Sequence, residues 1–161
     1  MKPRVYVEAS IVSYLTARPA RDIVIAGRQQ STRDWRATAP RRFEMVVSDL
    51  VLQEAAGGDP AAARARLDAL ASFVRLDATA AQELTERLVG TGALPERAAP
   101  DAAHVAVAAA NGIDYLVTWN FKHIANAAAK RRIETACRHA GFECPVICSP
   151  DELMEGADDE P

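Results

Sequence analysis

The sequence contains no apolar run long enough to cross a membrane as a helix. A transmembrane helix needs roughly 20 consecutive apolar residues, and no segment of the 161 residues approaches that length. At the start, residues 1–4 precede a short apolar run that is broken at Glu8, a pattern unlike that of a secretory signal. We therefore expect a cytoplasmic protein with no membrane partner.

Cysteine is scarce, and the common catalytic motifs are missing. Cys137, Cys144 and Cys148 include no Cys-x-x-Cys pair, so we expect free thiols in a reducing compartment rather than a disulfide or a zinc site. The sequence also has no Gly-x-Ser-x-Gly elbow, no Walker loop and no Gly-x-Gly-x-x-Gly fingerprint. The sequence therefore gives no support for a hydrolase with a nucleophilic triad. It also argues against the common nucleotide-binding folds.

The total charge of −3 conceals two parts of opposite sign. Residues 151–161 hold six acidic side chains and no basic one, which leaves 19 Lys and Arg residues against 16 acids in the rest, a net charge of +3. We expect residues 1–153 to form one domain and residues 154–161 to form a disordered acidic tail. Because the body is basic, the total charge does not argue against a nucleic-acid partner.

Short β-prone segments alternate with helical ones along the sequence. This alternation indicates βαβ crossovers, and hence an α/β domain whose parallel sheet has helices on both faces. Pro40 is expected to end one helix, and Ser48 to cap the next. The expected strands cover residues 4–8, 45–47, 73–76, 115–118 and 146–148. The expected helices cover residues 11–15, 22–38, 49–56, 60–71, 79–89, 101–110 and 124–140, with a loop over 90–99.

Polar side chains stand where the expected strands end, at the edge where open parallel sheets bind ligands. Glu8 ends the first strand, Glu54 lies on the helix after the second, and Asn120 follows the fourth. Asp101 opens the helix that leads into the fourth strand, so it lies near the same edge. Each has a simpler explanation, namely an arginine partner or a helix cap for Glu8, an exposed position for Glu54, a cap for Asp101 and a turn for Asn120. Their convergence on one edge favours a site.

The residue types limit the chemistry of this site. Three carboxylates and one amide are hard oxygen ligands suited to Mg²⁺ or Mn²⁺. Glu8, Glu54, Asp101 and Asn120 are therefore the candidate metal ligands and catalytic residues. Ions held there can bind a phosphodiester, activate water and stabilise the leaving oxygen, so the residues point to phosphodiester hydrolysis.

Four segments in this order resemble the PIN domain, whose largest group is the VapC-like toxin ribonucleases of bacterial toxin–antitoxin systems. The segments are Val5–Ser13, Ser48–Glu54, Pro100–Ala108 and Tyr115–His123. The resemblance extends from Arg4 to about Leu153. It implies a three-layer, Rossmann-like α/β/α domain with a central, mainly parallel sheet of about five strands. It also implies a homodimer, bound Mg²⁺ or Mn²⁺, RNA as the substrate and an antitoxin protein as the partner.

The resemblance assigns roles residue by residue. Glu54 and Asp101 match the second and third acids of the family's site, and Ser10 and Thr118 match its supporting hydroxyl residues. Glu8 stands where the family usually has an aspartate, which is one methylene shorter.

The fourth position of the site also departs from the family. Asn120 occupies a place where many members have an aspartate, so three formal negative charges remain rather than four. This favours one bound metal ion over two.

Residues near these acids are candidates for support or for RNA contact. His104 lies one helical turn after Asp101 and is a candidate hydrogen-bond donor to a carboxylate. Lys122 and His123 follow the fourth strand closely and can reach a phosphate. Trp119 either stacks on a base or packs in the core.

Arginine is concentrated between residues 18 and 42, which hold seven arginines against two acidic residues. A second basic group comprises residues 130–132 with Arg138. These groups are either solvated helix faces or contacts to phosphates along an RNA path. Arg18, Arg21 and Lys122 are the candidate RNA-binding residues.

The hypothesis from the sequence is a metal-dependent endoribonuclease of the PIN type, the toxin of a type II toxin–antitoxin pair. The alternative is a catalytically weak or inactive PIN-like module that binds RNA or protein, which Glu8 and Asn120 favour. A phosphatase-like hydrolase is less favoured, because Glu8 is not part of an Asp-x-Asp nucleophile pair.

Overall fold

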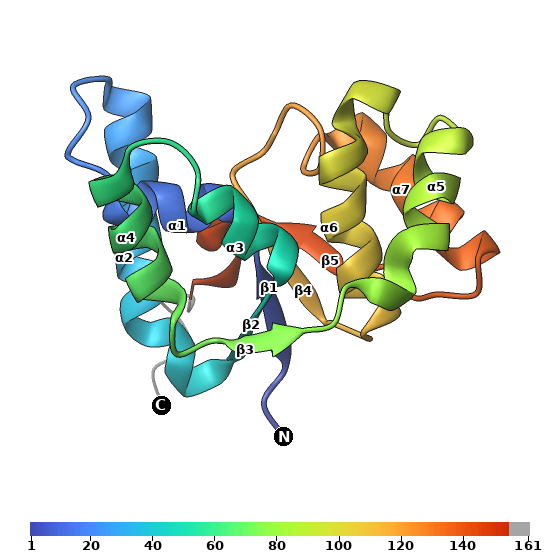
Figure 1. Ribbon diagram of the computed structural model, residues 1–161, viewed down its shortest axis with the longest axis horizontal. Helices are drawn as coiled ribbons and strands as arrows, with labels where there is room; N and C mark the ends of the chain where they lie inside the picture. The colour runs from blue at the N-terminus through green and yellow to red at the C-terminus, as the bar shows by residue number, and fades with distance from the viewer. Residues whose placement is uncertain (155–161) are drawn as a thin grey trace.

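A five-stranded parallel sheet forms the centre of the protein (Figure 1). The computed structural model describes residues 1–154, so the expected acidic tail over 154–161 lies outside the described residues apart from Met154. The strands are β1 (Arg4–Val7), β2 (Glu44–Ser48), β3 (Val74–Leu76), β4 (Tyr115–Val117) and β5 (Val146–Cys148). Their order is β3-β2-β1-β4-β5, and every neighbouring pair is parallel, which confirms the predicted α/β class.

The central strands are buried on both faces, as expected of a parallel sheet covered by helices. In β1, Val5 and Tyr6 are 0% exposed and Val7 is 2% exposed. Val5 lies opposite Met45 of β2 and Tyr115 of β4. This register explains why the strands have continuous apolar runs rather than alternating polar and apolar residues.

Helices cover both faces of the sheet and form the three expected layers. In Figure 1, α1, α2 and α4 lie on one side of the sheet, and α5, α6 and α7 lie on the other. No helix within residues 1–154 has the length and apolar character needed to cross a bilayer. The helices are α1 (Ala9–Thr16), α2 (Ile23–Arg42), α3 (Asp49–Ala55), α4 (Pro60–Leu70), α5 (Gln82–Gly90), α6 (Ala99–Ala110) and α7 (Ala127–His139). Three short 3-10 helices are η1 (Thr79–Ala81), η2 (Glu96–Ala98) and η3 (Pro150–Leu153).

The strand order creates one topological switch point. β1 and β4 are neighbours, but the chain continues from β1 toward β2 on one side and from β4 toward β5 on the other. Connections that diverge in this way leave a crevice at the carboxyl ends of the two strands. The segments after β1 and β4 therefore meet at the expected site.

Several predicted boundaries are wrong for local reasons. The helix with Pro40 continues to Arg42, because a proline in the last turn removes few backbone hydrogen bonds, and Lys2 Nζ donates to the Pro40 carbonyl at 2.8 Å. The expected loop over 90–99 contains η2 and the first residue of α6. The last long helix begins at Ala127 rather than 124, because Asn126 caps it. Ser48 precedes α3, but its side chain makes no cap hydrogen bond.

Helix α2 is attached to the segment after β4 by a buried hydrogen bond. The Trp119 indole, in a residue 6% exposed, donates from Nε1 to Thr32 Oγ1 at 2.8 Å. Trp119 also packs edge-to-face against Tyr14 of α1. By contrast, Trp35 Nε1 has no hydrogen-bond partner within residues 1–154. The Trp119 bond therefore fixes a specific position for the loop that follows β4.

We expect Thr32→Val to destabilise the fold, because it removes the acceptor of Trp119 Nε1 and keeps the shape of the side chain. A buried donor left without a partner costs about 1–3 kcal/mol, and urea denaturation should show a loss of unfolding free energy of that size. The control is Thr135→Val, which removes an exposed hydroxyl that bonds Arg131 O. That control should change the free energy by less than about 0.5 kcal/mol, and an equal loss in both variants would contradict the role of the bond.

Candidate functional site

Glu8 lies directly after β1 and is buried despite its charge, with the residue 5% exposed. Its Oε2 accepts hydrogen bonds from Ser10 N at 3.0 Å and from Thr118 Oγ1 at 2.8 Å, and a further one from Ser10 Oγ. The bond from Ser10 N makes Glu8 the N-cap of α1, so the capping role considered for it is present. These donors offset the cost of burying a carboxylate without a cation.

The two hydroxyl residues beside Glu8 also hold the segment after β4. Trp119 N donates to Ser10 Oγ at 2.9 Å, and Asn120 N donates to Thr118 Oγ1 at 3.0 Å. Within the described residues, the side-chain hydrogen bonds of Glu8 all involve Oε2. Its other carboxylate oxygen, Oε1, therefore remains open to a ligand.

Glu54 reaches the same region from α3 and ends a buried hydrogen-bond relay. We use the term relay for Ser48, Tyr6, His104 and Glu54. The Tyr6 hydroxyl lies 2.7 Å from Ser48 Oγ and 2.7 Å from His104 Nδ1. His104 Nε2 lies 2.7 Å from Glu54 Oε1. His104 is 0% exposed and the Glu54 side chain is 41% exposed, so the relay connects the core to the surface.

The relay has a consistent order of donors when His104 is neutral and carries its proton on Nε2. Ser48 then donates to Tyr6, Tyr6 donates to His104 Nδ1, and His104 Nε2 donates to the Glu54 carboxylate. Burial, reinforced by the charges of Glu8 and Glu54, raises the pKa of Tyr6, so its hydroxyl keeps the proton that this order requires. The relay thus fixes the orientation of Glu54.

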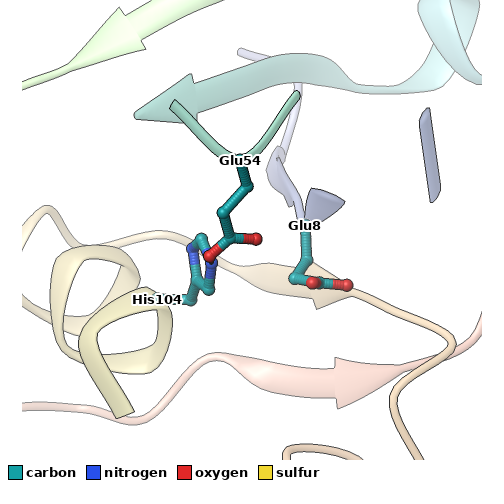
Figure 2. Close-up of side chains that lie close together, drawn as sticks. All are labelled: Glu8, Glu54 and His104. Carbon is teal, nitrogen blue, oxygen red and sulfur yellow. The ribbon is translucent and has the colours of Figure 1, made fainter. Parts of the chain in front are cut away.

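Glu8, Glu54 and His104 lie close enough together to hold a metal ion (Figure 2), although both ring nitrogens of His104 already serve the relay. One ligand atom from each lies within 4.8 Å of the other two. Figure 2 shows the Glu54 carboxylate against the His104 ring, with Glu8 entering from a separate segment. Two acids far apart in sequence, one directly after β1 and one on α3, therefore meet at the switch point.

Asp101 stands in the first turn of α6, close enough to Glu54 for their charges to interact, but it is not part of the group formed by Glu8, Glu54 and His104. Burial raises the pKa of its carboxyl, and the nearby charge of Glu54 acts in the same direction. A hydrogen bond with Asn120 and the proximity of His123 and His104 lower that pKa, by less than burial raises it. The ionised form of Asp101 is thus disfavoured in the folded protein.

Asn120 connects Asp101 to the loop after β4. Its Oδ1 accepts from His123 N at 3.1 Å, and its backbone carbonyl accepts from Ala125 N at 2.8 Å. The turn role considered for Asn120 is therefore present. Because Oδ1 serves the turn, the amide N–H₂ is the group with which Asn120 bonds Asp101.

The remaining candidates divide between this site and other parts of the surface. His123 is half-buried beside Asp101, and Lys122 is exposed next to it. Arg18 and Arg21 are exposed in the connection between α1 and α2 and have no ion pair with a site acid within the described residues. The sequence reasoning missed Tyr6 and Ser48, since both resemble ordinary strand residues.

We expect Tyr6→Phe to destabilise the protein, because it leaves both Ser48 Oγ and His104 Nδ1 without their partner. Unpaired buried polar groups cost about 1–3 kcal/mol, a loss that chemical denaturation can measure. Tyr115→Phe is the matched control, since the Tyr115 hydroxyl makes no hydrogen bond within residues 1–154. Equal stability of the two variants would show that the relay does not hold the core.

Asp101→Asn should raise the unfolding free energy of the metal-free protein at pH 7. Burial raises the pKa of Asp101 in the folded state, so above that pKa its ionisation costs folding free energy. This cost disappears as the pH falls through the raised pKa toward the unfolded value of about 3.9. The stability difference between variant and wild type should therefore shrink over that window in urea titrations with EDTA. A difference independent of pH would contradict it.

Comparison with known proteins gives a structural match without a sequence match. No protein-family model and no curated protein matches the sequence. The fold matches a chain in the crystal structure of VapBC2 from Rickettsia felis bound to a DNA fragment from their promoter. The identity is 17% and the TM-score 0.59, over 90% of this chain and 97% of that chain. The protein therefore has the PIN-domain, VapC-like fold that its sequence segments predicted.

Proposed function

We propose that this protein is a metal-dependent endoribonuclease that hydrolyses phosphodiesters of cytoplasmic RNA. The observation that carries the proposal is the meeting of Glu8, Glu54 and His104 at the switch point of the sheet, with Asp101 near Glu54. Nothing in the packing of the core requires Glu8 and Glu54 to meet. Like charges that are brought together in this way favour a bound cation.

The residues present fit Mg²⁺ or Mn²⁺. Glu8 Oε1 makes no hydrogen bond within the described residues, and Glu54 keeps one oxygen beyond the one that His104 contacts. With Asp101 these acids form a set of hard oxygen donors. The raised pKa of Asp101 fits as well, because a nearby cation would favour its ionised form. Glu8, Glu54 and Asp101 would hold the ion, and Asn120 would assist.

The protein's own residues supply the order that catalysis needs. Ser10 and Thr118 fix the Glu8 carboxylate, and His104 fixes that of Glu54, so the acids are oriented before a substrate binds. The ion would supply positive charge that polarises the scissile phosphate and offsets charge on the leaving oxygen. Attack by water would leave a 5′-phosphate and a 3′-hydroxyl. Since Asn120 is neutral, we propose one ion rather than two.

We also propose that the protein is the toxin of a type II toxin–antitoxin pair, with a protein antitoxin as its partner and a homodimer as its assembly. The structural match to VapBC2, which was crystallised with a DNA fragment from their promoter, supports this assignment. The shared fold extends over nearly all of both chains.

A second candidate function is an inactive module that binds RNA or protein. Two observations favour it, namely the commitment of Asn120 Oδ1 to the turn and the three donors that already surround Glu8 Oε2. Such a protein would bind RNA but would not produce new ends. A cleavage assay therefore separates the two functions.

We expect Asp101→Asn to abolish RNA cleavage that requires Mn²⁺ and stops on addition of EDTA. The variant removes a proposed metal ligand and leaves the residue's size unchanged, so circular dichroism should show a folded protein. Asp68→Asn, on the exposed side of α4, is the control for the charge change and should cleave at the wild-type rate. The readout is the rate at which 5′-phosphate ends appear on a labelled RNA.

Three results would decide the proposal. Loss of cleavage in Asp101→Asn alone supports it. Unchanged cleavage in that variant contradicts the site assignment. A wild-type protein that binds RNA in Mn²⁺ but forms no new ends contradicts the nuclease and supports the binding module.

A further inference from the structure

Two adjoining hollows form a groove beside the acidic site. The first has a volume of about 250 Å³ and the second about 480 Å³, and both are lined by Ala93 and Arg132. They lie between α7 on one side and α5 with the segment that follows it on the other. We call this feature the α5–α7 groove.

One face of α7 lines the groove, and small residues on that face give the groove its depth. The residues of this face are Ala129, Arg132, Ala136 and His139, whose spacing places them on one side of the helix. Ala129 and Ala136 are buried, so they form the floor together with Ala93. Arg132 is exposed and forms part of the wall.

The charge of the groove has one sign. Its walls carry basic side chains and no carboxylate. They are Arg87, Arg97, Lys122, His123, Arg131, Arg132 and His139. A third hollow of about 860 Å³, near Cys144, also has basic residues, but Glu134, Glu143 and Glu152 line it as well. The groove is therefore distinguished by charge and not by size.

The groove begins at the acidic site. His123 lines the first hollow and also faces the carboxyl of Asp101. Its backbone N–H is fixed by Asn120 Oδ1 at 3.1 Å. His123 therefore connects the first hollow to the acidic site.

Three of the basic side chains that line the groove have no partner within the described residues. Arg97, Lys122 and Arg132 make no ion pair or side-chain hydrogen bond within the described residues. Arg87 contacts Glu83 at 3.2 Å, but both side chains are more than half exposed, so this pair is weak. The groove thus presents unneutralised positive charge to a ligand.

The arginines of α2 differ in this respect. Arg28 stacks on Trp119 and Phe121, and Arg36 stacks on Phe73. Arg33 donates to Gln30. These three guanidinium groups are engaged within the protein, which weakens the expectation that α2 forms the RNA path but leaves Arg18 and Arg21 as candidates.

We propose that the α5–α7 groove binds an unpaired RNA strand adjacent to the scissile phosphate, an inference that rests on the proposed nuclease function. Arg97, Lys122 and Arg132 contact successive phosphates, and the alanine floor accommodates ribose and base. Unpaired RNA fits because the groove is a recess between two elements, whereas a duplex presents a broad surface of paired strands. An acidic peptide is the rival ligand, but it would lack bases to cover the apolar floor.

The test is the salt dependence of RNA binding, measured in EDTA so that cleavage does not occur. A fluorescent single-stranded oligoribonucleotide is titrated with wild type, Arg97→Gln and Arg132→Gln at several salt concentrations. A plot of log K against log [salt] has a negative slope, and loss of one phosphate contact should reduce its magnitude by about 0.7. The affinity should fall about tenfold near 50 mM salt. Arg64→Gln, an exposed arginine on α4, removes the same charge and should behave as wild type.

The outcomes separate this inference from the proposed function. Reduced slopes in both groove variants, with Arg64→Gln unchanged, support the groove. Wild-type slopes in both variants overturn it, whether or not the wild-type protein cleaves RNA with Mn²⁺. If Arg18→Gln and Arg21→Gln reduce the slope instead, the strand follows α2, and the inference is wrong. An acidic peptide whose binding is weakened by Arg132→Gln but which does not displace the oligoribonucleotide from wild type would assign the groove to a protein and also overturn it. Failure to cleave, with intact groove binding, contradicts only the nuclease.

Discussion

The burial of the Glu8 carboxylate is the constraint on which the rest of the site depends. The charge stays buried because backbone and hydroxyl donors from two segments converge on a single oxygen, Oε2. The same donors join the end of β1 to the end of β4, since Ser10 and Thr118 also accept hydrogen bonds from the backbone after β4. The buried Glu8 carboxylate thereby caps the start of α1 and helps to fix the path of the loop after β4.

The site is maintained at a cost to the fold. Asp101 is held where burial disfavours its charge, and Glu54 is held by a histidine that has no exposure to solvent. Both arrangements bury polar groups, which costs more free energy than burying apolar groups at the same positions. Such local conflicts between stability and arrangement are typical of functional sites rather than of structural cores.

The approach of Glu8 and Glu54 and the support from Ser10, Thr118 and His104 could be predicted from the sequence and its family resemblance, whereas the contacts of Tyr6 and Ser48 could not. Glu8 and Asn120 follow β-prone segments, and parallel strands place their carboxyl ends at one edge, so convergence follows from topology alone. Tyr6 gave no such signal, because its neighbours in β1 are equally apolar and only the register shows which groups its hydroxyl meets. Ser48 was predicted to cap α3, and its hydroxyl contacts Tyr6 instead. The α5–α7 groove was beyond prediction for a similar reason, since its walls come from separate elements that meet only in the folded protein.

The relay has a consequence for how this protein can change over evolutionary time. With the proton of neutral His104 on Nε2, each member donates to the next, from Ser48 to the carboxylate of Glu54, which only accepts. A single replacement leaves a neighbour unpaired in the core, whereas replacement of two adjacent members by apolar residues removes both halves of a bond at once. Substitutions at these positions are therefore epistatic. The relay can be lost by two simultaneous substitutions of adjacent members. If the substitutions occur one at a time, the protein with only the first substitution is less stable.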